Sequence, residues 1–102
     1  MTRGEIWLTQ IGRKTRPVLI LTRPEVIDVR QRVTVAEITT SIRGLAAEVD
    51  FNHEDAGLDQ PSVINCDGVH TINRSSLTNH VGTVDDVTMA DVCWAVGYAL
   101  GC

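Results

Sequence analysis

Residues 17–22 read Pro-Val-Leu-Ile-Leu-Thr, a continuous apolar run that ends at the helix- and strand-breaking pair Arg23-Pro24. Such a run is typical of a strand covered on both faces, because an alternating pattern would leave one face to water. Its proline stands at the first position, where a strand tolerates the missing amide hydrogen. The sequence therefore predicts a buried strand over 17–22, with packed layers on both sides of it.

Further strands are predicted on either side of this run. The polar link 11–15, which contains a glycine, separates residues 17–22 from an alternating segment at its N-terminal side. An Asp-Gly pair at 67–68, a turn dipeptide, is flanked by two apolar segments and predicts a hairpin. The predicted strands are 5–9, 33–40, 48–51, 62–66, 69–72 and 81–84.

The C-terminal residues change to a helical period. Apolar residues recur at helical spacing and form one stripe: Met89, Val92, Cys93, Val96 and Leu100. Thr88 is the predicted N-cap, with Asp91 reaching back to it, and Gly101 suits the C-terminal end. Short strands followed by one helix predict a mainly β fold, a small and strongly bent β-barrel closed by a C-terminal helix.

Length and composition limit the possible classes of protein. The 102 residues, 43% of them hydrophobic, suit a single domain spanning 1–102. Only four residues are aromatic, which excludes an aromatic-rich stacking platform for single strands. Residues 1–32 hold seven basic and three acidic side chains, whereas residues 33–102 hold two and ten. The basic residues of 1–32 predict a phosphate-binding surface. The alternative is an ordinary solvated surface whose positive charges are balanced by acidic residues elsewhere in the protein.

The cysteines and the chain start indicate a compartment. Cys66, Cys93 and Cys102 cannot all pair within one chain, and they have neither CxxC nor Cys/His ligand spacing. No apolar run reaches the 18 or more residues that a membrane span needs, and the N-terminus does not read as a signal peptide. We expect a cytoplasmic protein without a disulfide framework, zinc site or other metal.

Four segments, in order along the chain, resemble the MazF/PemK family of toxin endoribonucleases. They are Arg3–Leu8, Arg16–Ile20, Ile38–Arg43, and Ser62–Ile64 with Thr71, Ile72 and Leu77. The resemblance implies an SH3-like barrel with a C-terminal helix, usually a homodimer. It implies sequence-specific cleavage of single-stranded RNA without metal or other cofactor, which inhibits translation. The 2′-hydroxyl attacks the adjacent phosphate and leaves a 2′,3′-cyclic phosphate and a 5′-hydroxyl. A cognate antitoxin would place an acidic, disordered tail across the RNA site.

The resemblance also assigns site residues. Arg16 matches the family's catalytic arginine, and a guanidinium can stabilise phosphorane oxygens by bidentate donation. Thr39 matches the catalytic threonine, whose hydroxyl would donate to the same oxygens. The alternative for both is an ordinary position on a strand surface. Further RNA contacts are expected from Arg13, Lys14, Arg43, Ser62 and Thr71.

Two departures from the family pattern bear on the chemistry. The loop before the catalytic arginine is shorter here, comprising only residues 11–15, which bears on the shape of the RNA groove. His70 stands where the family often carries an arginine, and an imidazole near a phosphate could transfer the proton that Arg16 holds too tightly. The alternative is that His70 is a strand residue that contacts only backbone or solvent.

Two other functions remain open from the sequence. The first is a non-enzymatic gyrase poison like the CcdB toxins, which act through a tryptophan close to the chain end; here Trp94 lies inside the predicted helix. The second is a barrel that binds RNA through its basic third without cutting it. Trp94 and Tyr98 lie off the helix stripe, and we expect them to pack against the barrel, with a dimer or antitoxin surface as the alternative.

Overall fold

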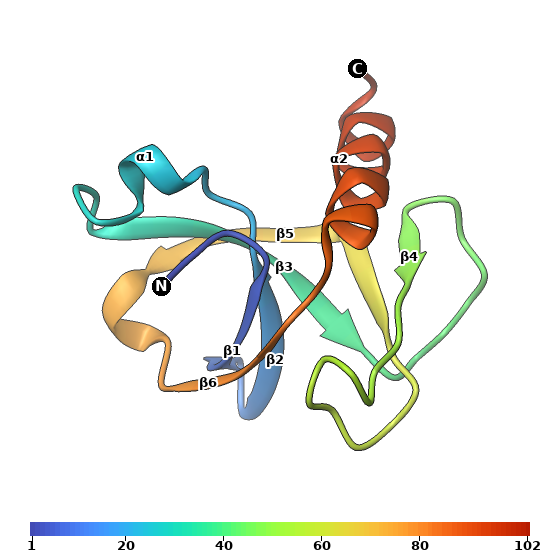
Figure 1. Ribbon diagram of the computed structural model, residues 1–102, viewed down its shortest axis with the longest axis horizontal. Coiled ribbons are helices and arrows are strands. Elements are labelled where there is room, and N and C mark those ends of the chain that lie inside the picture. Colours follow the sequence, from blue (N-terminus) through green and yellow to red (C-terminus); the bar gives the residue numbers. More distant parts are fainter.

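The computed structural model describes residues 1–102 and has one antiparallel sheet of six strands with a long C-terminal helix (Figure 1). The sheet order is β4-β5-β3-β2-β1-β6. The strands are β1 (Glu5–Ile11), β2 (Lys14–Ile20), β3 (Arg32–Thr39), β4 (Glu48–Asp50), β5 (Val63–Asn73) and β6 (Asn79–Thr83). The helices are α1 (Pro24–Ile27), α2 (Asp86–Leu100) and a 3-10 turn, Arg74–Ser76. The expected mainly β fold with a C-terminal helix is confirmed, as a bent half-barrel whose edges are β4 and β6.

The predicted burial on both sides is confirmed for Val18, Leu19 and Ile20, but the predicted bounds of the strand are wrong. β2 begins at Lys14 and ends at Ile20, so Pro17 stands inside the strand, and the partly buried Leu21 and Thr22 lie beyond its end. Leu19 faces a core of 12 buried residues, while Val18 and Ile20 face a separate core of six. All three side chains are fully buried. Successive side chains of a strand point to opposite faces, so a continuous apolar run serves two cores at once.

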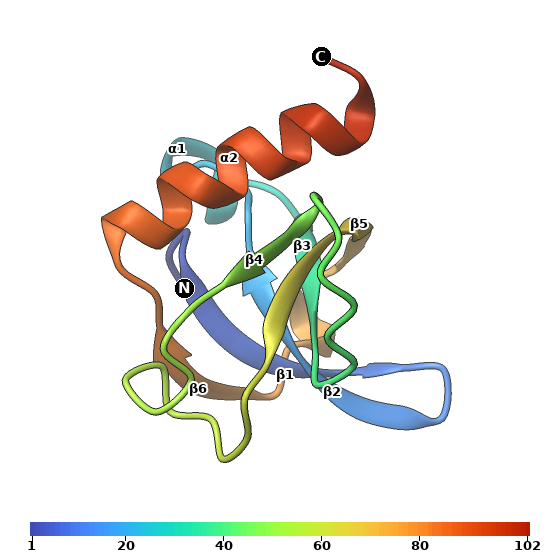
Figure 2. The same cartoon turned by 90° about the vertical axis from the view of Figure 1, so that its right-hand side faces the viewer.

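The larger core lies between the sheet and α2, which crosses one face of the sheet (Figure 2). Val92 and Ala95 are the buried residues of the helix, with Met89, Val96 and Ala99 packed beside them. The predicted stripe is thus rotated: Cys93 is exposed and Leu100 is 71% exposed. The apolar spacing located the helix but did not establish which flank of a largely apolar helix meets the sheet.

The smaller core lies on the opposite face, under α1. Ile27 of this helix packs with apolar residues of β2 and β3 and with Leu77. Pro24, which ends the apolar run, occupies the first turn of α1, where its fixed φ and missing amide hydrogen cost nothing. The smaller core covers only one end of this face, and the other end remains open.

The predicted turn at Asp67-Gly68 is wrong. The flanking segments form one strand, β5, and both pair with β3 instead of with each other. Val69 pairs with Ala36 and Asn65 pairs with Glu37, so residues 66–68 have no partner on β3 and form a bulge. The Asn65 side chain accepts the Asp67 backbone amide at 3.1 Å, which stabilises the bulge locally.

The polar link 11–15 is a tight hairpin turn. Ile11 pairs with Lys14, which leaves Gly12 and Arg13 as the turn, and Gly12 has a φ of +62°. Glycine adopts this left-handed conformation without the strain that a side chain would cause, which makes it common in tight hairpin turns. The β1–β2 hairpin projects beyond the body of the sheet (Figure 2).

The N-terminal end of α2 also differs from the prediction. Asp85, and not Thr88, is the N-cap: its carboxylate accepts the backbone amide of Thr88 at 2.8 Å. Hydrogen bonds from Thr88, first through its side chain and then through its backbone, lower the pKa of Asp85 below the usual value. The predicted end at Gly101 is confirmed, since this residue is left-handed with a φ of +78°.

The aromatic residues of α2 do not pack against the barrel, which corrects that expectation. Trp94 is 65% exposed and Tyr98 is 57% exposed. Their rings stack on each other, with centroids 5.6 Å apart. Neither helix combines the length and apolar character that crossing a lipid bilayer requires.

Candidate active site

A polar hollow of about 200 Å³ lies on the sheet face opposite α2, next to the smaller core. Its nine lining residues come from β2, β3, β4, β5 and the segment between β3 and β4: Arg16, Glu37, Thr39, Ser41, Arg43, Leu45, Glu48, Asn65 and Asp67. Only one of them is hydrophobic. Three predicted site residues, Arg16, Thr39 and Arg43, therefore line the same hollow.

Strand pairing explains why Arg16 and Thr39 meet. Val18 of β2 pairs with Glu37 of β3, and the strands are antiparallel. Arg16 lies two residues before Val18, and Thr39 lies two residues after Glu37. Because the strands run in opposite directions, both side chains lie at the same end of the pair and on the same face as Val18 and Glu37. Both side chains are partly exposed. The Thr39 hydroxyl oxygen accepts the Ser41 amide at 3.0 Å, so its own hydrogen remains available to donate.

Glu48 holds the loop that carries Arg43. One carboxylate oxygen, Oε1, accepts the backbone amides of Arg43, Gly44 and Leu45 at 3.0, 2.8 and 3.3 Å. Three converging amides form a nest for a negative charge, which this carboxylate fills. Glu48 therefore fixes the wall of the hollow, and the three loop amides stabilise its negative charge.

His70 reaches the hollow through a partner that the sequence analysis missed. Its Nε2 lies 2.9 Å from Oε2 of Glu37, a hollow-lining carboxylate on β3. Glu37 is two residues from Thr39 and shares its face of the strand, a local signal that could have identified it. The contact with His70 could not be read from spacing, since it depends on the β3–β5 register.

The remaining predicted RNA contacts lie outside the hollow. Arg13 and Lys14 are exposed at the tip of the β1–β2 hairpin. Thr71 is exposed on β5, with its hydroxyl oxygen 3.1 Å from that of Thr34. Ser62 is only 8% exposed and donates its hydroxyl to the Gln60 carbonyl at 2.9 Å.

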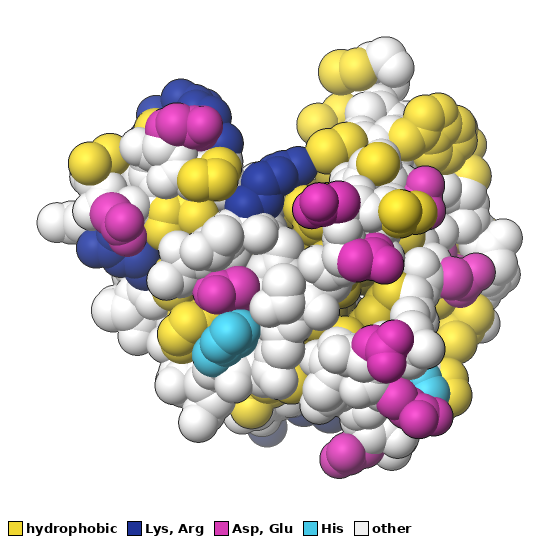
Figure 3. Space-filling model, viewed as in Figure 1, with side chains coloured by type: hydrophobic (Ala, Val, Ile, Leu, Met, Phe, Trp, Pro, Cys, Tyr) yellow, Lys and Arg dark blue, Asp and Glu magenta, His cyan; other side chains and the backbone are white.

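The basic N-terminal third does not form a single surface. Of its seven basic side chains only Arg16 lines the hollow, whereas Arg3, Arg23 and Arg30 line a groove between α1 and α2. Figure 3 shows basic side chains in the notch between these helices and acidic ones beside it, toward β4. The basic side chains of residues 1–32 are thus divided between the hollow, the groove, the tip of the β1–β2 hairpin and the start of β3.

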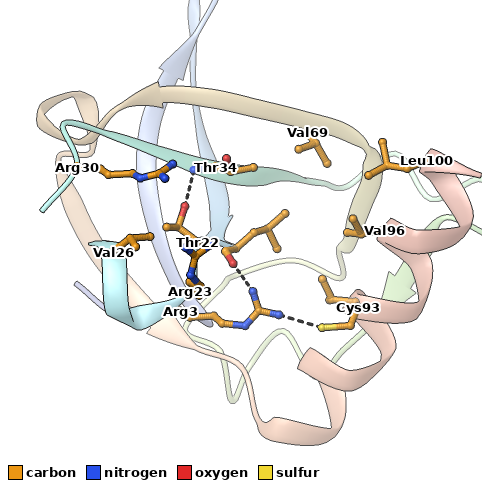
Figure 4. Close-up of a pocket in the computed structure, with 12 residues that line it drawn as sticks. Arg3, Thr22, Arg23, Val26, Arg30, Thr34, Val69, Cys93, Val96 and Leu100 are labelled. Atoms are coloured by element: carbon orange, nitrogen blue, oxygen red, sulfur yellow. Dashed lines mark hydrogen bonds between the residues drawn. The ribbon is translucent and has the colours of Figure 1, made fainter. Parts of the chain in front are cut away.

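The groove between α1 and α2, of about 500 Å³, is larger than the hollow and mainly apolar (Figure 4). Arg3 donates to the Leu21 carbonyl and, at 2.9 Å, to the Cys93 sulfur. No carboxylate or imidazole lines this groove. It offers positive charge without a group suited to accept a proton at neutral pH, so the hollow is the better candidate for cleaving a phosphodiester.

Comparisons with known proteins point the same way. The sequence profile of the family described as PemK-like, MazF-like toxin of type II toxin-antitoxin system matches residues 2–100. The probable endoribonuclease MazF5 of Mycobacterium tuberculosis is 37% identical over 103 residues, covering 98% of this chain and 93% of the relative.

Two solved structures are similar over nearly the whole chain. The Mycobacterium tuberculosis toxin MazF-mt6 has a TM-score of 0.89 and 41% identity, covering 95% of this chain and 96% of that one. An endoribonuclease in complex with its cognate antitoxin, from Mycobacterial species, also has a TM-score of 0.89, at 25% identity, covering 99% and 95%.

Proposed function

Because the chain belongs to the MazF/PemK family of toxin endoribonucleases of type II toxin–antitoxin systems, we propose that its hollow cleaves single-stranded RNA at a short recognition sequence. Cleavage of messages in this way inhibits translation. The observation that carries the proposal is the meeting of Arg16 and Thr39 in one polar hollow, on neighbouring strands of a rigid sheet. Rigid placement is what contacts to a transition state require.

The proposed reaction is internal transesterification. The ribose 2′-hydroxyl attacks the adjacent phosphorus, and the products are a 2′,3′-cyclic phosphate and a 5′-hydroxyl end. Arg16 donates two hydrogen bonds to the phosphorane oxygens, and Thr39 donates one from its free hydroxyl hydrogen. Arg43, Arg13 and Lys14 would hold neighbouring phosphates, which positions the RNA without reading its bases.

An RNA with a single 2′-deoxy residue at the cleaved bond tests this reaction. We expect full cleavage of the all-ribose RNA in the presence of EDTA and none of the deoxy-substituted RNA, because the nucleophile is missing. The experiment uses purified protein without gyrase, so cleavage also separates this function from a gyrase poison. Binding without cleavage over a wide panel of sequences would support the non-catalytic barrel instead.

We further propose that the active form is a homodimer regulated by an antitoxin. The Trp94–Tyr98 pair on α2 leaves two large apolar rings in water, which suits a second protein surface. A structure of a relative with its cognate antitoxin supports regulation of this kind, and an acidic tail would compete with RNA for Arg16 and Arg43. Light scattering at micromolar concentration should give the mass of a dimer. A fully active monomer would contradict the proposal that the active form is a homodimer.

A cytoplasmic location remains part of the proposal. Cys66, Cys93 and Cys102 are all free thiols, as a reducing compartment would keep them. Burial, followed by the nearby Asp67 and Cys93, raises the pKa of the Cys66 thiol to about 11, which leaves it unreactive at neutral pH. Labelling of unreduced protein that is taken directly from cells and denatured should find all three thiols free.

A further inference from the structure

The proposed reaction needs a group that removes the proton of the 2′-hydroxyl. Arg16 and Arg43 cannot accept it at neutral pH, because a guanidinium stays protonated in proteins. The Thr39 hydroxyl oxygen already accepts the Ser41 amide. The remaining candidates in the hollow are its three carboxylates, Glu37, Glu48 and Asp67.

The surroundings of these carboxylates differ. Glu48 is engaged by three backbone amides through one oxygen and holds the loop in place. Asp67 lies on the bulge of β5, where its side chain is exposed and has no hydrogen-bond partner to fix its direction. Neither carboxylate is both held in a fixed position and free to accept a proton.

Glu37 combines both. It stands within β3, on the same face as Thr39, and is only partly exposed. Its Oε2 is bonded to His70 Nε2 at 2.9 Å, while its Oε1 accepts no hydrogen bond from the protein. The bulge closes in from the other side: a Cβ at Gly68 would stand 2.6 Å from Oε2, so a side chain there would push this carboxylate out of its present position.

We propose that Glu37, bonded to His70 and two residues from Thr39 on one face of β3, accepts the proton of the attacking 2′-hydroxyl, and that His70 is its positioning residue. This inference rests on the proposed internal attack. It gives His70 a different part from the phosphate-binding arginine for which it stands in the family pattern.

The proposed step balances without a metal or other cofactor. The proton of the 2′-hydroxyl passes to Glu37 Oε1 as the bond between O2′ and phosphorus forms. The bond between phosphorus and O5′ breaks, and the departing oxygen takes a proton from water. Glu37 then returns its proton to the solvent, so the enzyme regains its starting state and nothing is oxidised or reduced.

The charges around Glu37 set the expected pH dependence. Arg16 faces it from β2, Asp67 and His70 from β5, Arg43 from the segment before β4, and Glu48 from the start of β4. Protonation of Glu37 at low pH removes the acceptor, so activity should fall on the acid side.

The direct test is Glu37→Gln, which keeps the shape of the side chain but cannot accept the proton. We expect kcat to fall by roughly 10²- to 10⁴-fold, the acid fall in the pH–rate profile to disappear, and the melting temperature to stay the same. Glu37→Asp should recover part of the rate. Glu25→Gln, the same change on the exposed α1 outside the hollow, is the matched control and should leave kcat unchanged.

A modified substrate identifies the proton that Glu37 handles. Sulfur in place of the bridging 5′-oxygen leaves without protonation, so it bypasses any acid but not the base. The defect of Glu37→Gln should persist on this RNA. Full recovery would place Glu37 at the leaving group and overturn the assignment.

Two variants test the role of His70. His70→Ala should lower kcat by roughly 10- to 100-fold with little change in KM, because the carboxylate loses its anchor. His70→Gln should retain more rate than His70→Ala, since its amide can still donate to Oε2 of Glu37. A raised KM with unchanged kcat would make His70 a phosphate contact and overturn the positioning role.

The wild-type protein keeps this test separate from that of the proposed function. If it fails to form a cyclic phosphate, or cleaves the 2′-deoxy RNA, the internal attack itself is wrong. If it passes both controls while Glu37→Gln cleaves as fast as Glu25→Gln, only the assignment of Glu37 is overturned.

Discussion

The two faces of the sheet use the same strands for different purposes. Leu19 and Ala36 pair across β2 and β3 and are buried in the larger core under α2. The neighbouring pair, Val18 and Glu37, points to the other face, where the smaller core gives way to the hollow. One face therefore supplies stability and fixes the backbone, and the other displays polar groups on that fixed backbone. If the two tasks are separate, substitutions on the covered face should change stability, and substitutions on the open face should change activity.

The largest effect is expected from the covered face. Leu19→Ala should reduce the free energy of unfolding by about 2–5 kcal/mol, because it removes a fully buried side chain from the larger core. Its kcat, measured where the protein remains folded, should stay near the wild-type value. Denaturant titration checks the first part, with the exposed Leu100→Ala as control. Equal losses for the two variants would contradict the assignment of the core.

Arg16→Ala should have the largest effect on the open face. We expect cleavage to fall by at least ~10²-fold, since the phosphorane oxygens lose two charged donors, while the melting temperature and dimer mass stay unchanged. Arg16→Lys should recover little, because an ammonium cannot reproduce bidentate donation. Arg32→Ala makes the same charge change at the far end of β3 and is the matched control. Near-wild-type cleavage by Arg16→Ala, once contamination by another nuclease is excluded, would show that the active site does not lie on this face of the sheet.

Thr39→Val should have a smaller effect, roughly a tenfold loss of kcat, because it removes a single neutral donor. The substitution keeps the shape and suits a strand, so the unfolding transition should be unaffected. Single-turnover cleavage at saturating protein separates this loss from weaker binding. A change confined to KM would show that Thr39 binds RNA without stabilising the transition state.

The smallest effect is expected at the N-terminus of α2. Asp85 has a lowered pKa in the folded protein, so its contribution to stability is present above the unfolded pKa and is lost as pH falls through the folded one. Asp85→Ala should lower the melting temperature by a few degrees at neutral pH. That difference should shrink below about pH 4. Thermal unfolding of both proteins across this range checks it, and a constant difference would contradict the cap.

Local patterns and the family resemblance predicted most of the fold and two residues that line the candidate site. The apolar run of β2 indicated burial on both faces, and the four family-like segments identified a MazF/PemK toxin; both are confirmed. Arg16 and Thr39 lie within those segments, and the structure brings them into one hollow. The resemblance assigned both residues, and the β2–β3 register places them on one face of the sheet.

Features that depend on long-range register could not be predicted in this way. The bulge at Asp67-Gly68 looks like a hairpin turn until both flanking segments are seen to pair with β3. The Glu37–His70 contact follows from that same register, across 33 residues of sequence. The exposure of Trp94 depends on how α2 is rotated on the sheet, and a largely apolar helix leaves that rotation undetermined.

The most direct test of the account is to map the RNA ends produced by wild-type protein and by Arg16→Ala in EDTA. The account predicts 2′,3′-cyclic phosphate and 5′-hydroxyl ends at one short sequence with the wild-type protein, and at least ~10²-fold fewer such ends with Arg16→Ala. Ends that carry a 5′-phosphate, or equal numbers of ends from both proteins, would contradict the claim that this face of the sheet cleaves RNA by internal attack.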